Sequence, residues 1–325
     1  MRFHHLAGIC EKSICTASPR ESRMTMRRNY LDKIFDGCGI QLNDPIAKCG
    51  ERVNAYDDPD VLGGIHDAME AFRKVGSVPD ESGNRTVVVY SPRERLRRDG
   101  SGNGTKLNGL IYVLTIEYLY KGGAAVDVMT LEDFLATDTN YDRVCFPNLI
   151  YATDVERTAL KRKLRRPGVS AVWMIAPGSA TDAGFSDAAM SELTGISLVG
   201  SGKTPFVRSV DAATSPFPAD GVVKTLADGS KSVFLPCPPR SPQLWREVLS
   251  ELGEHLWVPV GDYLRRQGDV VMFHTARNAE HTVSLPMGLR GKTATELFSG
   301  RTFSGDVLKF RTDGPDTLLF KFNMR

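Results

Sequence analysis

The sequence predicts an α/β fold: a doubly wound, flavodoxin-like parallel sheet with helices on both faces, followed by a small antiparallel β domain. Three observations predict it. Apolar strand-like runs alternate with helical patterns over short links between residues 82 and 258. The first run, Thr86 to Tyr90, is β-branched almost throughout, which is typical of a strand buried on both faces. After about residue 258 the pattern changes to short strands separated by turn residues, which is typical of an antiparallel module.

The elements of the α/β domain follow one another in order. Strands are expected at 86–90, 124–130, 143–147, 169–178 and 231–238, and helices at 105–120, 131–136, 153–168, 186–196 and 241–253. Thr153 and Ser241 are expected N-caps, because a hydroxyl directly before a helix can accept a hydrogen bond from its first turn. Right-handed crossovers would then place helices on both faces of the sheet. The antiparallel module is expected to use strands at 270–276, 281–286, 294–300, 307–312 and 317–322.

The region before the first strand divides into two segments. Residues 1–28 show no clear period and are expected to form a loose tail. Residues 29–81 are expected to form a helical linker that belongs to the α/β domain (82–258), with a β-sandwich-like domain at 259–325. A helix in this linker is expected to start at Asp57-Asp58-Pro59 and end at Gly76. The residues expected on its apolar face are Val61, Leu62, Ile65, Ala68, Met69 and Phe72.

Composition excludes several classes of function. The chain has 325 residues, and 41% of them are hydrophobic. Its net charge of only +2 does not indicate binding to a nucleic acid. The six cysteines show neither CxxC nor zinc-ligand spacing, so we expect reduced thiols, no metal and no cofactor. No apolar run is long enough for a signal peptide or a membrane span. These features predict a soluble, cytoplasmic protein that does not interact with membranes.

Cys145 raises the question of a nucleophile. A catalytic cysteine in this architecture sits on a tight strand-to-helix turn with flanking glycines. Cys145 instead lies inside an apolar run and is followed by Phe146 and Pro147, and no histidine occurs between His66 and His255. Core packing is therefore favoured, and no catalytic residue is assigned. His274 and His281 have no partner at metal-ligand spacing, so structural roles are favoured for them as well.

The loops that follow three strands form the candidate pocket. Ser91, Asn148, Gly178 and Ser179 would lie at the carboxyl edge of the sheet, where ligands bind in this architecture. Tyr151 is added because its ring could stack on a sugar, as could Trp257. The alternative interpretation is that these are ordinary connecting loops that bind no ligand.

Three other stretches could be either anion-binding sites or ordinary exposed surface. The glycine-rich loop 99–106 could bind an anion but lacks the phosphate-binding motifs, so a surface loop is favoured. The basic runs 93–98 and 161–166 are expected to be solvated surface rather than anion sites.

Residues 141–178 have a distinctive order: a strand that ends in Pro-Asn, a Thr-Asp helix start, a basic helix, and a strand that ends in W-x-x-A-P-G. This stretch resembles the middle domain of the beta-galactosidases of glycoside hydrolase family 42. Residues 232–264 and the strands up to residue 322 are also similar to these enzymes, and residues 55–72 resemble the stretch before the middle domain. The resemblance implies a class I glutamine-amidotransferase-like fold, known in the family as the trimerisation domain, and a C-terminal β domain.

In that family, catalysis belongs to an N-terminal barrel that carries two glutamates, and a barrel needs about 250 residues. Fewer than 90 residues precede the first strand here, so neither glutamate is assigned. We therefore expect a barrel-less protein that serves oligomerisation, as a homo-oligomer (a trimer by resemblance) or with a separate barrel-containing chain. Carbohydrate binding and origin as part of a longer gene remain open. The alternative is a small hydrolase that acts on a glycoside or acyl substrate from the strand-end pocket.

Overall fold

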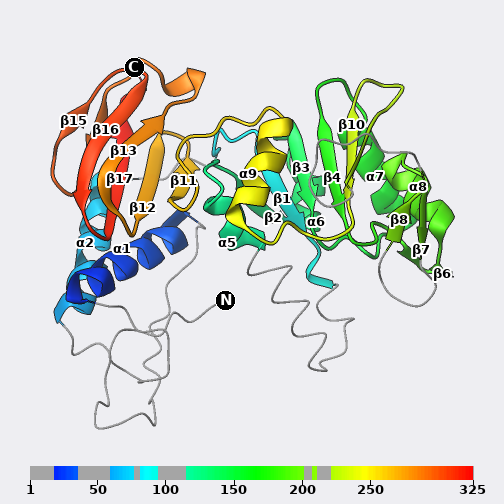
Figure 1. The fold of residues 1–325 in the computed structure, drawn as a ribbon, viewed down its shortest axis with the longest axis horizontal. Helices are drawn as coiled ribbons and strands as arrows, with labels where there is room; N and C mark the ends of the chain where they lie inside the picture. The colour runs from blue at the N-terminus through cyan, green and yellow to red at the C-terminus, as the bar shows by residue number, and fades with distance from the viewer. Residues whose placement is uncertain are drawn as a thin grey trace, which may run out of the picture. The chain divides into compact units, whose positions relative to one another are not determined.

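The computed structural model describes residues 18–35, 59–76, 81–93, 115–200, 207–210 and 221–324. They form two compact units (Figure 1). One is a continuous α/β unit, Asn84–His255. The other joins the residues up to Gly83 with those from Leu256 onward, so its two parts are separated in the sequence by the whole α/β unit.

A six-stranded sheet forms the centre of the α/β unit, in the order β2-β1-β3-β4-β10-β9. Its first five strands are mutually parallel, while β9 pairs antiparallel at one edge. The parallel strands therefore have the flavodoxin-like order 2-1-3-4-5, and the predicted fold class is confirmed. The bounds are β1 Thr86–Tyr90, β2 Asp127–Thr130, β3 Arg143–Phe146, β4 Ser170–Met174, β9 Val222–Thr225 and β10 Lys231–Leu235.

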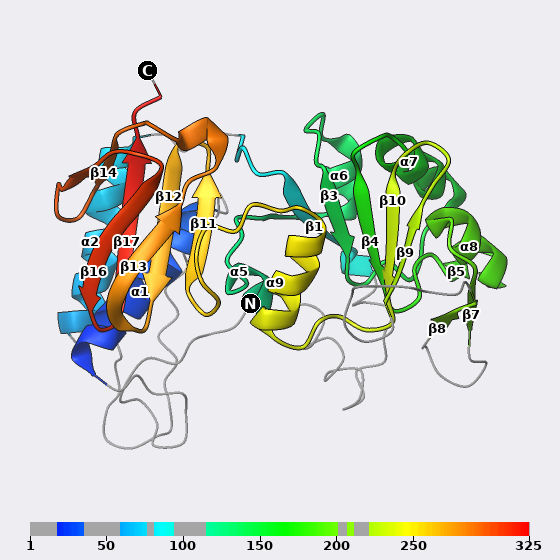
Figure 2. The same cartoon turned by 45° about the horizontal axis from the view of Figure 1, so that its top comes forward.

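Helices flank this sheet on both sides. Helices α5 and α9 contact each other, and so do α6 and α7 (Figure 2). The bounds are α5 Thr115–Tyr120, α6 Leu131–Ala136, α7 Asp154–Leu164, α8 Asp187–Thr194 and α9 Pro242–Glu251. Thr153 and Ser241 cap α7 and α9 as predicted, and Thr153 forms a full capping box with Glu156. Of the helix expected at 105–120, residues 105–114 lie outside the described part, as does the glycine-rich loop 99–106.

The core of the α/β unit lies between the sheet and these helices. Phe146 on β3 stacks on Trp173 of β4, with ring centroids 4.5 Å apart. Both side chains are fully buried, and Cys145, the preceding residue of β3, is buried as well. The indole Nε1 of Trp173 donates to Ser232 Oγ at 3.0 Å, so its polar atom is satisfied inside the core. Strands β3, β4 and β10 are thereby locked together by side chains as well as by backbone pairing.

The second unit contains the predicted antiparallel strands. A five-stranded sheet has the order β11-β12-β17-β14-β15, and β13 pairs with β16 in a separate two-stranded sheet. Phe273, Phe310 and Phe320 pack together through edge-on and tilted ring contacts. The bounds are β11 Tyr263–Gln267, β12 Val270–Thr275, β13 Asn278–Ser284, β14 Ala294–Glu296, β15 Thr302–Phe303, β16 Val307–Asp313 and β17 Asp316–Phe322, with a short 3₁₀ helix at Met287–Leu289.

The expectation of a loose tail over residues 1–28 is wrong for its last part, because helix α1 spans Pro19–Phe35. Its helical period is weak in the sequence, because arginines stand among the apolar residues, although Met24, Leu31 and Phe35 share a buried face. Charged contacts add to this apolar burial: Arg23 and Arg27 pair with Asp67, and Asp32 pairs with Arg265. Residues 1–17 lie outside the described part of the chain.

Helix α2, Pro59–Val75, is the helix expected in the linker; it packs on α1 and belongs with α1 to the second unit, not to the α/β unit. It ends before Gly76 as expected, whereas Asp57 and Asp58 lie outside the described residues. The expected apolar face is partly wrong, because the side chains of Leu62 and Met69 are each 48% exposed. The buried face is Val61, Gly64, Ile65, Ala68, Ala71 and Val75.

Candidate functional site

Ser91 and Asn148 meet at the carboxyl edge of the sheet, between β1 and β3, where the strand order reverses. Asn148 Oδ1 accepts from the Ser91 backbone N–H at 2.9 Å, and Asn148 Nδ2 donates to the Ser91 carbonyl at 3.0 Å. Their exposed fractions are 0% for Asn148 and 1% for Ser91. This is the place where a doubly wound sheet usually opens to a ligand. Here a side-chain amide fills it and joins the two strand ends.

Tyr151 also lies at this edge, but its ring is buried. Its hydroxyl donates to Asp182 Oδ1 at 2.5 Å, and its backbone bridges to Ala180. These contacts anchor a hairpin formed by β5 (Ala180–Thr181) and β6 (Gly184–Phe185). Tyr151 therefore helps to position the loop after β4, and its buried ring is not available to stack on a sugar.

Gly178 and Ser179 form the turn that follows β4. Gly178 has a φ of 65°, and an added Cβ would come within 2.7 Å of Leu193 Cδ2, so only glycine fits. Its N–H donates to Leu149 O at 2.7 Å, and its carbonyl accepts from Arg157 Nη1 at 2.9 Å. Ser179 is buried beside it. The structure thus brings all five predicted residues to one edge of the sheet. There they belong to loops that contact one another through hydrogen bonds.

Ile175, which directly follows β4, was not among the predicted site residues. It has a φ of 70°, a left-handed conformation that a β-branched residue rarely adopts. In α/β enzymes, a strained turn of this kind after a strand presents the nucleophile. Here the side chain on that turn is aliphatic and buried. Pro177 and Gly178 predicted a turn after the strand. Nothing in the sequence predicted that Ile175 adopts the left-handed backbone conformation in that turn.

Two glutamates flank one guanidinium at the same edge. Arg93 forms an ion pair with Glu156, and its Nε lies 3.4 Å from Glu132 Oε1. Burial alone would raise the pKa of Glu156, but hydrogen bonds from the Thr153 backbone and from Arg93 outweigh it and lower that pKa. The carboxylate of Glu156 is therefore held in its charged form.

Cys145 is fully buried on β3. Burial, together with the nearby charge of Glu254, raises the pKa of its thiol to about 12. Because the thiolate is the nucleophilic form of cysteine, this side chain is inert at neutral pH. The interpretation of Cys145 as core is confirmed.

The two histidines of the second unit contact threonines. His274 Nδ1 lies 2.8 Å from Thr317 Oγ1, and His281 Nε2 lies 2.9 Å from Thr312 Oγ1. Among the described residues, no three His, Cys, Asp or Glu side chains are grouped so that they could hold a metal ion. Within the same residues, no helix has the length and apolar character needed to cross a membrane.

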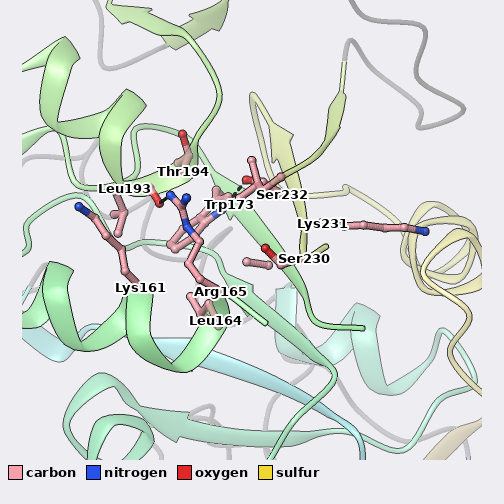
Figure 3. A pocket seen from close by; sticks show the side chains of 11 residues that line it. Lys161, Leu164, Arg165, Trp173, Leu193, Thr194, Ser230, Lys231 and Ser232 are labelled. Atoms are coloured by element: carbon pink, nitrogen blue, oxygen red, sulfur yellow. Dashed lines mark hydrogen bonds between the residues drawn. The ribbon is translucent and has the colours of Figure 1, made fainter. Parts of the chain in front are cut away.

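A separate hollow lies on the α/β unit between α7, α8 and the strands β4 and β10 (Figure 3). It has room for about one water molecule, which is far below the usual size of a ligand pocket. Arg165 lies over it and donates to the carbonyls of Glu192 and Leu193 at the end of α8, and Lys161 pairs with Glu192. These cations of the run 161–166 thus tie α7 to α8.

Comparison of the sequence with protein-family models and with curated proteins finds no match. Solved structures do match. A catalytic mutant of a GH42 beta-galactosidase from G. stearothermophilus has a TM-score of 0.60 at 13% identity, covering 93% of this chain and 51% of that one. The enzyme from Rahnella sp. R3 has a TM-score of 0.55 at 14% identity (96% and 52% covered), and that from Bacillus circulans 0.53 at 12% (84% and 46%). The chain thus spans about half the length of these beta-galactosidases and has the fold of that half.

Proposed function

We propose that this chain is a non-catalytic, beta-galactosidase-like protein that serves oligomerisation within a glycoside hydrolase assembly. The observation that carries the proposal is the Ser91–Asn148 pairing, which closes the sheet at its expected ligand edge in a fold similar to half of a GH42 beta-galactosidase. A sheet closed in this way acts as a rigid frame, and its outer surfaces are available to bind other chains.

The carboxylates at this edge support a structural role. A retaining glycosidase needs two carboxyl groups about 5 Å apart, one of them protonated to act as the acid. Glu132 and Glu156 both pair with Arg93, and the lowered pKa of Glu156 disfavours its protonated form. Both groups are therefore arranged to hold Arg93 across the strand ends rather than to deliver a proton.

Two kinds of partner fit this proposal. The first is further copies of the same chain, with three copies being the number that the family resemblance implies. The second is a separate chain that supplies a catalytic barrel. A carbohydrate ligand on an outer surface is compatible with either arrangement.

Light-scattering mass measured over a hundredfold range of concentration tests the proposal, with turnover of a chromogenic galactoside and of an acyl ester measured on the same sample. We expect a mass that is a multiple of the chain's 35.8 kDa and no turnover above buffer. A monomer at every concentration would remove the oligomerisation role. Turnover that disappears on Ser91→Ala or Asn148→Ala would replace the proposal with a hydrolase that works from the strand ends.

A further inference from the structure

Two Asp-Gly pairs lie wholly within the described part of the chain. Asp228-Gly229 lies between β9 and β10, and Asp313-Gly314 joins the end of β16 to the turn that leads into β17. An aspartate isomerises most readily before glycine, because glycine has no side chain to hinder attack of its nitrogen on the preceding carboxyl. The two pairs have the same chemistry, so their surroundings in the fold decide which of them reacts.

Hydrogen bonds hold both groups of Asp228-Gly229 that would have to react. The Gly229 N–H donates to Leu226 O at 2.9 Å, and Asp228 Oδ1 accepts from the Ser230 hydroxyl and from the Ser230 backbone N–H at 2.8 Å. These bonds from Ser230 also lower the pKa of Asp228, which disfavours the protonated carboxyl that loses water in the reaction. The nitrogen and the carboxyl must therefore both break contacts before they can meet.

Asp313-Gly314 lacks these restraints. The Asp313 side chain is 77% exposed, and its Oδ1 lies 3.5 Å from Arg311 Nε, which is beyond ordinary hydrogen-bond length. Within the described ranges of the chain, no group accepts a hydrogen bond from the Gly314 N–H. Both reacting groups of this pair are therefore available without the loss of a hydrogen bond.

The turn that contains Asp313 also contacts helix α1. Arg20, in the first turn of α1, donates from Nε to Pro315 O at 3.0 Å, and its Nη2 donates to Asp316 Oδ2 at 3.3 Å. Isomerisation of Asp313 would route the main chain through the side-chain carboxyl and lengthen it by one methylene group. Since Pro315 and Asp316 follow almost directly, this change falls at the contact with Arg20.

We propose that Asp313-Gly314 is a site of spontaneous aspartate isomerisation, and that the product weakens the contact between this turn and Arg20. The Gly314 nitrogen bonds to Cγ of Asp313, and the carboxyl OH leaves as water with the proton of the N–H, which closes a succinimide ring. Water then opens the ring. Its attack on Cγ restores aspartate, whereas its attack on the α-carbonyl gives isoaspartate, so water is released once and consumed once.

The first test incubates the full-length protein at neutral pH and measures isoaspartate in the tryptic peptides 225–231 and 312–321, which separate the two pairs. Transfer of labelled methyl groups by an isoaspartyl methyltransferase reports the product. We expect peptide 312–321 to gain isoaspartate at least about fivefold faster, the rate equivalent of one net hydrogen bond that must break first at Asp228. An equal or lower rate in peptide 312–321 would overturn the proposal. In urea the two peptides should react alike, and a difference that persists there would show that the fold does not select the site.

The second test asks what the product does to α1. Asp313→Glu keeps the charge at an exposed position but needs a larger ring, so it should form no isoaspartate in peptide 312–321 and should fold like wild type. After the same incubation, amide hydrogens at the start of α1 should exchange faster in wild type than in this variant. Equal exchange, in wild type that has accumulated isoaspartate, would overturn the effect on Arg20 and leave the modification site in place.

Discussion

Asn148 and Ser91 are joined by two reciprocal hydrogen bonds between a side-chain amide and a strand-end backbone, 57 residues apart in the sequence. The pairing satisfies the backbone N–H and the backbone carbonyl of Ser91, and both residues are buried. In a doubly wound sheet, this is the position at which a ligand would otherwise enter. The contribution of this contact to the free energy of unfolding therefore tests whether the edge serves stability rather than ligand binding.

Asn148→Ala should destabilise the α/β unit by about 2–4 kcal/mol, because two hydrogen bonds are lost and the Ser91 N–H and carbonyl remain buried without them. Urea unfolding with equal slopes for both proteins would measure the difference. Asn278→Ala is the control: Asn278 is exposed on β13, and its change should lie within about 0.5 kcal/mol of wild type. An equally small effect at Asn148 would mean that the edge relaxes or admits water, and therefore that Asn148 does not close it.

The sequence indicated this edge but not its closure. Strand runs such as 86–90 and 143–147 identify parallel strands, and parallel strands place Ser91, Asn148 and the turn at Gly178 on one edge. Whether Asn148 points to solvent or to a neighbouring backbone depends on its rotamer, which no local pattern encodes. The same edge contains Ile175, whose left-handed backbone conformation no feature of the sequence indicated.

Helix α1 shows a different limit. Sequence periodicity detects helices that bury an apolar stripe. In α1 that stripe is short, and much of the helix is held by distant polar contacts: Arg23 and Arg27 pair with Asp67, 44 and 40 residues away, and the Thr317 hydroxyl donates to the Met24 carbonyl, 293 residues away. Contacts of this range give a helix no local signature. By contrast, α2 was found because Val61, Ile65 and Ala68 do repeat on one face.

Cys145 should resist alkylation in the folded protein. With its pKa raised to about 12, the thiolate fraction at pH 8 is on the order of 10⁻⁴, and the side chain is also sealed from reagent. Peptide mass mapping after brief iodoacetamide treatment should show Cys237, which is partly exposed, labelled well before Cys145. Both should be labelled together in urea. Rapid labelling of Cys145 without denaturant would reopen the case for a reactive thiol.

The adjacent glycines of α2 should respond in opposite directions to alanine. A Cβ at Gly64 would lie 2.4 Å from the Arg23 carbonyl oxygen and 2.9 Å from Met26 Cβ, so α1 would have to move away. A Cβ at Gly63 meets only the end of the Arg23 side chain at 3.2 Å, which can shift. We expect Gly64→Ala to destabilise by about 1–3 kcal/mol and Gly63→Ala to be neutral or stabilising by up to about 1 kcal/mol.

Thermal unfolding of the two alanine variants beside wild type would check this pair. The comparison is matched, since both positions are in the same helix and gain the same intrinsic helix propensity. Equal melting temperatures for the two variants would mean that α1 and α2 are not in close contact at Gly64.

Acid should weaken the docking of α1 on α2. Burial opposes ionisation of Asp67, but hydrogen bonds from Arg23 and Arg27 outweigh it, so the pKa of Asp67 in the folded protein is below its usual value. A carboxyl with a lowered pKa contributes stability above its unfolded pKa of about 4 and loses it as the pH falls through the lower, folded value. Asp316 has the opposite sign, because burial raises its pKa, and its contribution is lost as the pH rises. Unfolding free energies between pH 2 and 6 should therefore fall more steeply toward acid in wild type than in Asp67→Asn. Parallel curves would show that Asp67 does not link its two arginines in solution.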